Sequence, residues 1–306
     1  MDDTQQKNRG IRRAALVGTA FAALAAIGFS TKAIFVKLAY QEPVDAVTLL
    51  TLRMVFSLPV FLVTGLFSRN PARPLEKQDW WTILALGLVG YYTSSLLDFL
   101  GLRYISAGLE RLILFLYPTM VMLMSAVLSR RTLRRREILA LLLSYAGIAL
   151  VFMQNLHLEG KGLVLGATLV FVSTLTYSVY LVGAGRAIAR IGATRFTSFA
   201  SIVSCFAVMA QFAVSHPLHL PPLSLRVYEL GLAMAIFSTA IPFFLLSAGI
   251  RMIGSGKTAL IGSLGPVTTL YLAHVFLGES FALQQILGSM LVMAGVLAIS
   301  LKPRGA

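Results

Sequence analysis

Apolar stretches separated by short polar connections make up almost the whole chain. Ten of these stretches are about 20 residues long, the length of a helix that crosses the hydrocarbon core of a membrane. They lie near residues 14–39, 47–67, 81–102, 107–129, 136–155, 160–183, 194–214, 227–249, 256–277 and 281–301. Because backbone polar groups inside a membrane must be paired within the spanning element, the pattern predicts an all-α integral membrane protein with ten transmembrane helices.

The ten stretches form two sets of five, because the sequence repeats itself at a constant offset of 148 residues. Segment Leu97–Pro118 matches Leu245–Pro266 at nine of 22 positions. Since each set has an odd number of crossings, the second set enters the membrane from the opposite face, as in transporters built from inverted repeats. The predicted divisions are a cytoplasmic tail at 1–13, a first five-helix repeat at 14–155, a second at 160–301 and a cytoplasmic tail at 302–306.

Composition and charge agree with a membrane protein. The chain is 57% hydrophobic and 12% charged, with a mean hydropathy of +0.81. Its net charge of +14 could suggest nucleic-acid binding, but 19 of the 26 Lys and Arg residues lie in the two tails and the even-numbered loops, against 3 in the odd-numbered loops. This asymmetry follows the positive-inside rule. It predicts cytoplasmic termini and the lipid bilayer, rather than nucleic acid, as the partner, with the basic segment 130–136 near lipid headgroups.

The end of the chain carries the most specific motif. The turn Leu277-Gly278-Glu279 follows Pro266 and precedes Gly288 and Gly295. With ten apolar stretches and the five-plus-five repeat, this ending resembles the drug/metabolite transporter superfamily, EamA type. The resemblance implies a multi-pass protein of the plasma (inner) membrane that carries small organic solutes, often as an exporter of amino acids or related metabolites. It also implies a cavity lined by helices one to four and six to nine, with the fifth and tenth outside it.

Six ionisable side chains lie within or at the ends of the first four apolar stretches. They are Lys32, Lys37, Arg53, Asp98, Glu110 and Arg111. At a rise of about 1.5 Å per residue, all six fall in the extracytoplasmic half of the membrane, although they come from four helices. A lipid-facing charge at such a depth costs a few kcal/mol, so these side chains are expected to face the interior of the bundle and to find partners there.

This cluster has three interpretations that the sequence leaves open. It can be a structural network of ion pairs. It can be a positive site for a substrate carboxylate, because its four cations outnumber its two anions. It can also couple transport to protons through Asp98 or Glu110, whose affinity for protons depends on burial and on neighbouring charges. We expect Lys32 with Arg53 or Arg111 to face the two carboxylates, so that a bound substrate competes with internal ion pairs.

Polar and aromatic side chains extend this candidate substrate-binding and coupling site. Tyr91, Ser95 and Asp98 share one face of the third predicted helix, because their spacings of four and seven residues correspond to whole helical turns. Glu110 and Tyr117 share a face of the fourth predicted helix for the same reason. The spacing therefore predicts that both helices present polar groups to the same interior.

Two prolines and two tyrosines indicate how the second repeat contributes. Pro118 and Pro266 occupy equivalent positions and predict a helix kink in each repeat, a feature that often marks the binding site of inverted-repeat carriers. Tyr177 and Tyr180 on the sixth stretch occupy positions that hold an aromatic residue and Lys32 in the first repeat. A cavity that is charged on one side and aromatic on the other suits an amphipathic solute.

Catalytic and cofactor chemistry finds little support in the sequence. The histidines have no cysteine or carboxylate at metal-ligand spacing, so neither a metal nor a cofactor is expected. We predict a secondary transporter, in the direction of export, for small organic metabolites such as amino acids or carboxylate-bearing amphipathic solutes. The alternatives are a membrane-embedded enzyme that modifies lipids or metabolites, and a carrier of cationic drugs. The pattern fits a monomer or a homodimer.

Overall fold

The computed structural model describes residues 3–68, 74–158, 162–216, 223–279 and 282–300, and within them every regular element is helical. Eight helical segments of these ranges are long and apolar enough to cross a membrane. Two further apolar helices, Gly265–Leu277 and Leu283–Ala298, are shorter than the other eight. The predicted C-terminal tail at 302–306 lies outside the described residues.

The helices follow each other in the same order in the two repeats. The first repeat contains α1 (Asp3–Ala39), α2 (Ala46–Phe67), α3 (Lys77–Leu86), the π-helix η1 (Gly87–Thr93), α4 (Ser94–Gly101), α5 (Ala107–Leu114), α6 (Tyr117–Leu128) and α7 (Arg135–Leu158). The second contains α8 (Leu163–Ile191), α9 (Ala193–Ser215), α10 (Leu225–Ala235), the π-helix η2 (Ile236–Ala240), α11 (Ile241–Ile253), α12 (Ser255–Gly262), α13 (Gly265–Leu277) and α14 (Leu283–Ser300). The offset of 148 residues in the sequence therefore corresponds to a repeat of secondary structure.

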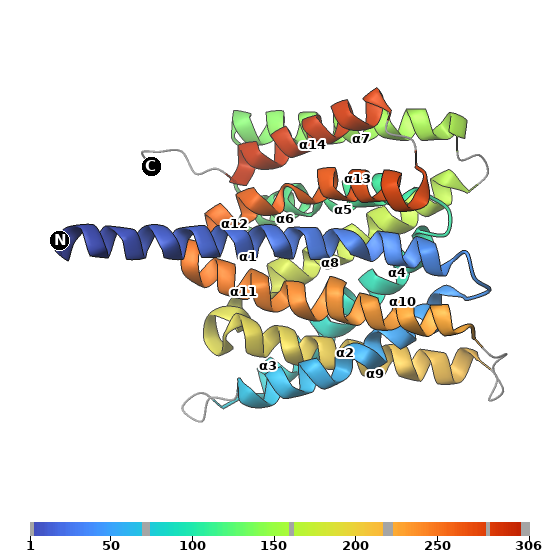
Figure 1. The fold of residues 1–306 in the computed structure, drawn as a ribbon, viewed down its shortest axis with the longest axis horizontal. Coiled ribbons are helices and arrows are strands. Elements are labelled where there is room, and N and C mark those ends of the chain that lie inside the picture. Colours follow the sequence, from blue (N-terminus) through green and yellow to red (C-terminus); the bar gives the residue numbers. More distant parts are fainter. Residues whose placement is uncertain (1–2, 69–73, 159–161, 217–222, 280–281, 301–306) are drawn as a thin grey trace.

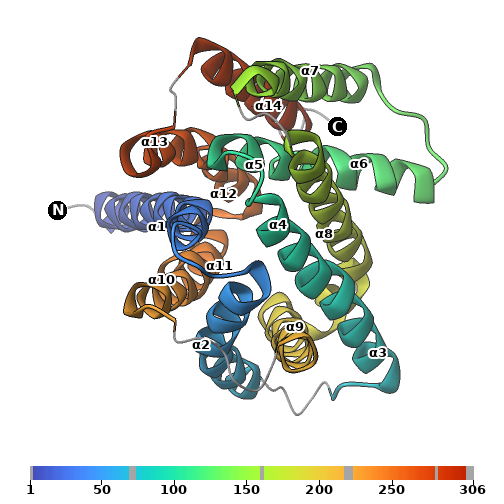
Figure 2. The same ribbon diagram turned by 90° about the vertical axis from the view of Figure 1, so that its right-hand side faces the viewer.

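Corresponding helices of the two repeats run in opposite directions. In Figure 1, α1 runs from the left end of the bundle to the right, whereas α8 runs from right to left. The packing follows the same relationship, because α1 packs on α11 and α13 while α8 packs on α4 and α6. Helices α7 and α14 lie side by side at the edge of the bundle, outside the remaining helices (Figure 2).

Two of the spanning helices contain a π-helix, and two have a break at the prolines where a kink is predicted. A π-helix divides the third predicted helix after α3 and the eighth after α10. The fourth ends as α5 at Leu114 and resumes as α6 with Pro118 in its first turn, and Pro266 begins α13 in the same way. Proline lacks the N–H group that continues a helix but is favoured in the first turn of a new one.

The first helix begins well before the apolar segment. Residues 3–13, predicted as a tail, form the first turns of α1, which runs without interruption from Asp3 to Ala39. The segment of α1 that is apolar enough to span a membrane is Ala15–Ala39. The start of the predicted span is therefore close to that of the observed apolar segment, although the helix itself is longer.

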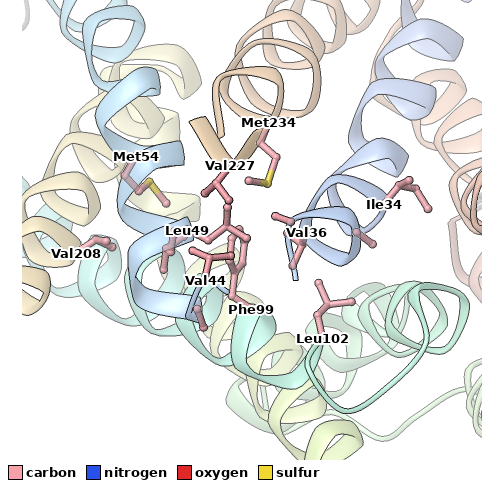
Figure 3. Packing of buried hydrophobic residues seen from close by; sticks show 14 of the residues in the cluster. Ile34, Val36, Val44, Leu49, Met54, Phe99, Leu102, Val208, Val227 and Met234 are labelled. Atoms are coloured by element: carbon pink, nitrogen blue, oxygen red, sulfur yellow. The ribbon is translucent and has the colours of Figure 1, made fainter. Parts of the chain in front are cut away.

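The largest group of buried apolar side chains joins both repeats near the connections 40–45 and 102–106. It contains Leu49 of α2, Phe99 of α4 and Met234 of α10, among others (Figure 3). These two connections lie at the right-hand end of the bundle in Figure 1, and the start of α3 and the end of α8 lie at the opposite end. The apolar cluster therefore fixes α1, α2, α4 and α10 relative to one another at the end where the ionisable side chains of the first repeat lie.

Candidate functional site

Lys32 lies between two carboxylates that come from different helices. Its Nζ atom is 2.5 Å from Oδ2 of Asp98 on α4 and 2.7 Å from Oε1 of Glu110 on α5. The side chains of Lys32, Asp98 and Glu110 are 13%, 5% and 0% exposed, respectively. We call these three residues the ion triad. The structure thus brings together three of the predicted site residues and pairs the lysine with both carboxylates.

The positions of the helix ends explain why the members of the triad meet. Asp98 lies in the last turn of α4 and Glu110 in the first turn of α5. Ser106 begins α5 as its N-cap, and its hydroxyl oxygen accepts a hydrogen bond from the backbone N–H of Leu109. The short connection between α4 and α5 therefore holds both carboxylates at one depth, opposite Lys32 near the end of α1.

Each carboxylate of the triad retains one oxygen that the lysine does not engage. Oδ1 of Asp98 and Oε2 of Glu110 are buried and have no hydrogen-bond partner among the residues that the structure describes. Burying an unpaired charged acceptor is costly, so these atoms favour a hydrogen-bond donor. The triad can therefore accept further hydrogen bonds while Lys32 stays in place.

The two arginines of the predicted site flank the triad. Nε of Arg53 donates to the Thr239 hydroxyl at 3.2 Å, and its guanidinium lies 5.6 Å from the ring centre of Phe99. Nε of Arg111 is buried and has no hydrogen-bond partner within the described ranges. Asp98 is close enough to interact electrostatically with both guanidinium groups. Within this group, three cations surround two anions.

The absence of a side chain at Gly265 leaves room for the guanidinium group of Arg111. A Cβ atom built on Gly265 would lie 2.6 Å from Nη2 of Arg111, a distance that real Cβ contacts do not show. The equivalent residue of the first repeat is Tyr117. The guanidinium therefore packs against the break between α12 and α13, at a position where the other repeat carries a large side chain.

The four predicted tyrosines form one continuous aromatic cluster. Tyr180 packs edge to face on Tyr91 with ring centres 5.1 Å apart, and it stacks on Tyr177 at 5.9 Å. Tyr177 in turn packs on Tyr117 at 5.8 Å, and Phe196 of α9 adds a ring 5.7 Å from Tyr180. Tilted and edge-to-face pairs at these distances are the favoured geometries of aromatic side chains.

The aromatic cluster and the cations are adjacent. Tyr91 is near enough to Arg53 for electrostatic interaction, and Tyr117 stands in the same relation to Arg111. The site therefore changes from charged at the ion triad to aromatic at the tyrosines, to which both repeats contribute. Of the predicted residues, Ser95 is partly buried, whereas the neighbouring Ser94 is fully inside and lies 3.0 Å from the hydroxyl of Ser173 on α8.

Two serines join the repeats at the proline breaks. The hydroxyl of Ser30 on α1 donates to the backbone carbonyl of Gly265 at 3.0 Å. The hydroxyl of Ser178 on α8 makes the equivalent, longer contact with the carbonyl of Tyr117 at 3.5 Å. Each hydroxyl is closer to a carbonyl of its own helix, at 2.7 Å from Ala26 for Ser30 and 2.7 Å from Thr174 for Ser178, so its single proton serves the contact across the repeats only in part.

Several residues of the site were not predicted from the sequence. Thr239, Gly265 and Phe196 all contact predicted residues. Thr239 and Gly265 stand 148 positions after Tyr91 and Tyr117, so the repeat itself carried a signal for them. Phe196 has no such signal, because its partner in the first repeat is Thr48, near the end of the bundle.

Ion pairs connect the repeats at both ends of the bundle. At the end of α8, Arg190 contacts Asp79 and lies 2.9 Å from Glu76 at the start of α3. At the opposite end, Arg226 at the start of α10 lies 3.7 Å from Glu42. Glu42 and Arg190 occupy equivalent positions of the two repeats, because they are 148 residues apart. The first repeat has an acidic residue at this position and the second has a basic one.

A second polar contact between the repeats lies beside Glu42. Oδ2 of Asp45, the N-cap of α2, is 3.1 Å from Nε2 of His216 at the end of α9. Burial raises the pKa of Asp45, but hydrogen bonds from Thr48 and His216 outweigh this effect and hold its pKa below the usual value. The carboxylate therefore favours its charged form and retains its capping role.

Comparison with known proteins places these features in a family context. The model of the EamA-like transporter family matches residues 16–153 and 164–301. The uncharacterized transporter YcbK of Bacillus subtilis (strain 168) is 31% identical over 284 residues, which cover 90% of each chain. The uncharacterized transporter YyaM of the same organism is 25% identical over 247 residues, covering 79% of this chain and 80% of that one. A solved crystal structure of 19% identity has a TM-score of 0.62 and covers 92% of this chain and 95% of its own, so the fold is shared.

Proposed function

Because this chain belongs to the EamA-like transporter family, we propose that it is a secondary transporter that exports small organic metabolites. The observation that carries the proposal is the joined site of the ion triad, two arginines and four tyrosines, which draws side chains from both repeats. A site at the junction of two inverted repeats is the expected place for a solute in such carriers.

The chemistry of the site supports a carboxylate-bearing amphipathic solute, such as an amino acid. Lys32 is engaged by both carboxylates of the triad, so the guanidinium groups of Arg53 and Arg111 are the cations with donors to offer. A guanidinium binds a carboxylate through two parallel hydrogen bonds, which a lysine does not. The rings of Tyr177 and Tyr180 supply an apolar wall for the remainder of the solute.

Alternating access follows from the contacts between the repeats at the two ends of the bundle. Opening one end separates α8 from α3 and breaks the contacts of Arg190 with Glu76 and Asp79. Opening the other end separates α10 from the α1–α2 connection and breaks the contact of Arg226 with Glu42. In the structure both sets of ion pairs are formed. A bound solute shifts the balance because its contacts with the triad and the arginines differ between the two open states.

We also propose ten membrane crossings in the plasma (inner) membrane, with both termini cytoplasmic. The two short apolar helices α13 and α14 then complete the second repeat as the ninth and tenth crossings, with α12 as the other half of the ninth. The excess of Lys and Arg in the tails and the even-numbered loops supports this orientation. A Leu133→Cys variant tests it. A thiol reagent that cannot cross the membrane should label position 133 only in permeabilised cells, and labelling in intact cells would overturn the orientation.

Transport by the purified protein tests the proposal as a whole. The protein is reconstituted into liposomes, and labelled amino acids, other organic anions and cationic drugs are offered with and without a pH gradient. We expect saturable exchange of a carboxylate-bearing solute, and a change in rate with the gradient if protons are coupled to transport. Exchange of cationic drugs alone, or chemical conversion of a solute without its movement, would contradict the proposal.

A further inference from the structure

Glu279, the last residue of the Leu277-Gly278-Glu279 turn, contacts the helix that carries Glu110 of the ion triad. Its Oε1 atom accepts a hydrogen bond of 2.7 Å from the backbone N–H of Ala107, and its Oε2 atom accepts one of 3.2 Å from Gly108. Ala107 and Gly108 are the first two residues of α5. Glu279 belongs to the second repeat and lies 172 and 171 positions from them in the sequence. The turn is therefore attached to a helix of the other repeat.

The contact completes the start of α5. The first N–H groups of a helix have no partner inside the helix. Here Glu279 accepts from Ala107 and Gly108, the Ser106 hydroxyl accepts from Leu109, and the Ser106 carbonyl accepts from Glu110. A negative charge at this end also complements the helix dipole. The beginning of α5 is thus fixed jointly by its own N-cap and by the end of α13.

The turn is itself well anchored. Gly278 ends α13 with a positive φ of 68°, a left-handed conformation that glycine adopts without strain. The backbone carbonyl of Glu279 lies 2.9 Å from Nδ1 of His274 on the last turn of α13. Gly108 permits close approach of the two helices, because a Cβ atom there would lie 2.7 Å from Leu270 of α13. Helices α5 and α13 are thus held together at this end.

The first repeat does not reproduce the contact. The residue 148 positions before Glu279 is Arg131, which cannot accept a hydrogen bond. Arg131 instead binds Glu137 in the first turn of α7 at 2.9 Å, and Glu137 accepts from the backbone N–H of Arg134 at 2.8 Å. The turn of the second repeat therefore contacts the helix that carries Glu110 and Arg111. The corresponding residue of the first repeat, Arg131, forms its ion pair with the nearby Glu137.

We propose that Glu279 is a positioning residue of the transport site. It ties the beginning of α5 to the end of α13 and so fixes where Glu110 and Arg111 lie relative to Lys32 and Asp98. The link to transport rests on the proposed function, whereas the attachment of α5 to α13 does not.

Hydrogen exchange and transport together test this role. The variants Glu279→Ala and Glu279→Gln are compared with Glu137→Ala, a matched control that removes a capping carboxylate from the other turn. In Glu279→Ala, the amides of residues 107–111 should exchange faster and the KM for the solute should rise about fivefold, as expected from the loss of a helix cap. The glutamine keeps one acceptor oxygen but loses the charge and places an NH2 group against the other N–H, so its KM should rise by an intermediate amount, about two- to threefold. The control should change neither quantity.

The outcomes separate the two proposals. Unchanged exchange at residues 107–111 in Glu279→Ala would overturn the positioning role, whatever the transport result. Faster exchange with an unchanged KM per folded molecule would show a structural cap without influence on the site, and would also overturn it. A wild-type protein that moves none of the solutes would contradict the proposed function, while the exchange data would still decide whether Glu279 holds α5.

Discussion

Lys32 and Tyr180 occupy the same position in the two repeats, yet their surroundings are chemically opposite. Lys32 binds two buried carboxylates, whereas Tyr180 packs among Tyr91, Tyr177 and Phe196. The backbones around them are related, because both lie on the first long helix of a five-helix unit. The comparison teaches that the repeat supplies the architecture, while the departures from the repeat supply the polarity of the site.

Other pairs of positions show the same division. The second repeat replaces Asp98 by Leu246 and Glu110 by Thr258, and it replaces Tyr117 by Gly265. Each replacement removes a charge or a ring from one side, and Gly265 makes room for Arg111 of the other side. The two sides are therefore complementary, and changes to either should affect a different part of a bound solute.

Removal of the central lysine should have the largest effect. Lys32→Met leaves two buried carboxylates without their cation, which costs roughly 3–5 kcal/mol. We expect loss of transport together with a lower yield of folded protein. The measurement is uptake by proteoliposomes, normalised to folded protein by size-exclusion chromatography.

The triple change Lys32→Met, Asp98→Asn and Glu110→Gln separates folding from function. It removes the charges of the triad together and should recover part of the folded protein, because the carboxylates no longer lack a cation, although Arg53 and Arg111 lose their neighbouring anions. Transport should remain absent. A triple variant that transports as well as the wild type would show that the triad is structural and would remove it from the site.

Changes on the aromatic side should weaken solute binding by a smaller amount. Tyr180 is 3% exposed, and truncation to alanine removes its contacts with three neighbouring rings. We expect Tyr180→Ala to raise the KM by about tenfold and Tyr180→Phe by less than about twofold, since aromatic pairs contribute about 0.5–1.5 kcal/mol each. Initial rates over a range of solute concentrations measure this effect, and an equal loss in both variants would indicate that the hydroxyl matters rather than the ring.

The ion pairs at the two ends should contribute unequally to the equilibrium between the two open states. Arg190 contacts two carboxylates, one of them on a buried Asp79, whereas Arg226 meets Glu42 at 3.7 Å. We expect Arg190→Ala to shift the balance between the two open states by about fivefold and Arg226→Ala by about twofold or less, as for partly exposed pairs. Labelling rates of a cysteine introduced at each end report the balance. A larger shift from Arg226→Ala than from Arg190→Ala would contradict this ranking of the two ion pairs.

The smallest effect is expected at the cap of α2. Asp45→Ala removes an N-cap and should lower stability by about 1 kcal/mol. Because the folded protein holds the pKa of Asp45 below its usual value, this contribution is present above the unfolded pKa, near pH 4, and is lost as the pH falls through the folded pKa. Melting temperatures of wild type and variant should therefore converge at low pH. A constant difference across the pH range would contradict the ionic role of the cap.

The sequence predicted the all-helical repeats because spans of apolar residues and a fixed offset are properties of the chain alone. It also predicted that Lys32, together with one of the arginines, faces Asp98 and Glu110, since each charge must find a partner in a membrane. It did not predict that Lys32 forms the ion pairs with both carboxylates, because the choice among Lys32, Arg53 and Arg111 depends on helix rotation and distance. The π-helices escaped prediction for a similar reason. Gly90 in η1 lies so close to Tyr180 that a Cβ atom would be 2.1 Å from it, and this contact is made only after the repeats pack.

The central claim is that the charged side of the site binds a carboxylate of the solute while the aromatic side binds its apolar part. Binding of a transported acid and of its uncharged amide to the same purified protein tests this claim most directly, with Arg111→Gln measured beside the wild type. The wild type should bind the acid at least about tenfold more tightly than the amide, and Arg111→Gln should lose most of this preference, because a bidentate ion pair is replaced by a neutral contact. Equal affinity of the wild-type protein for acid and amide would contradict the claim.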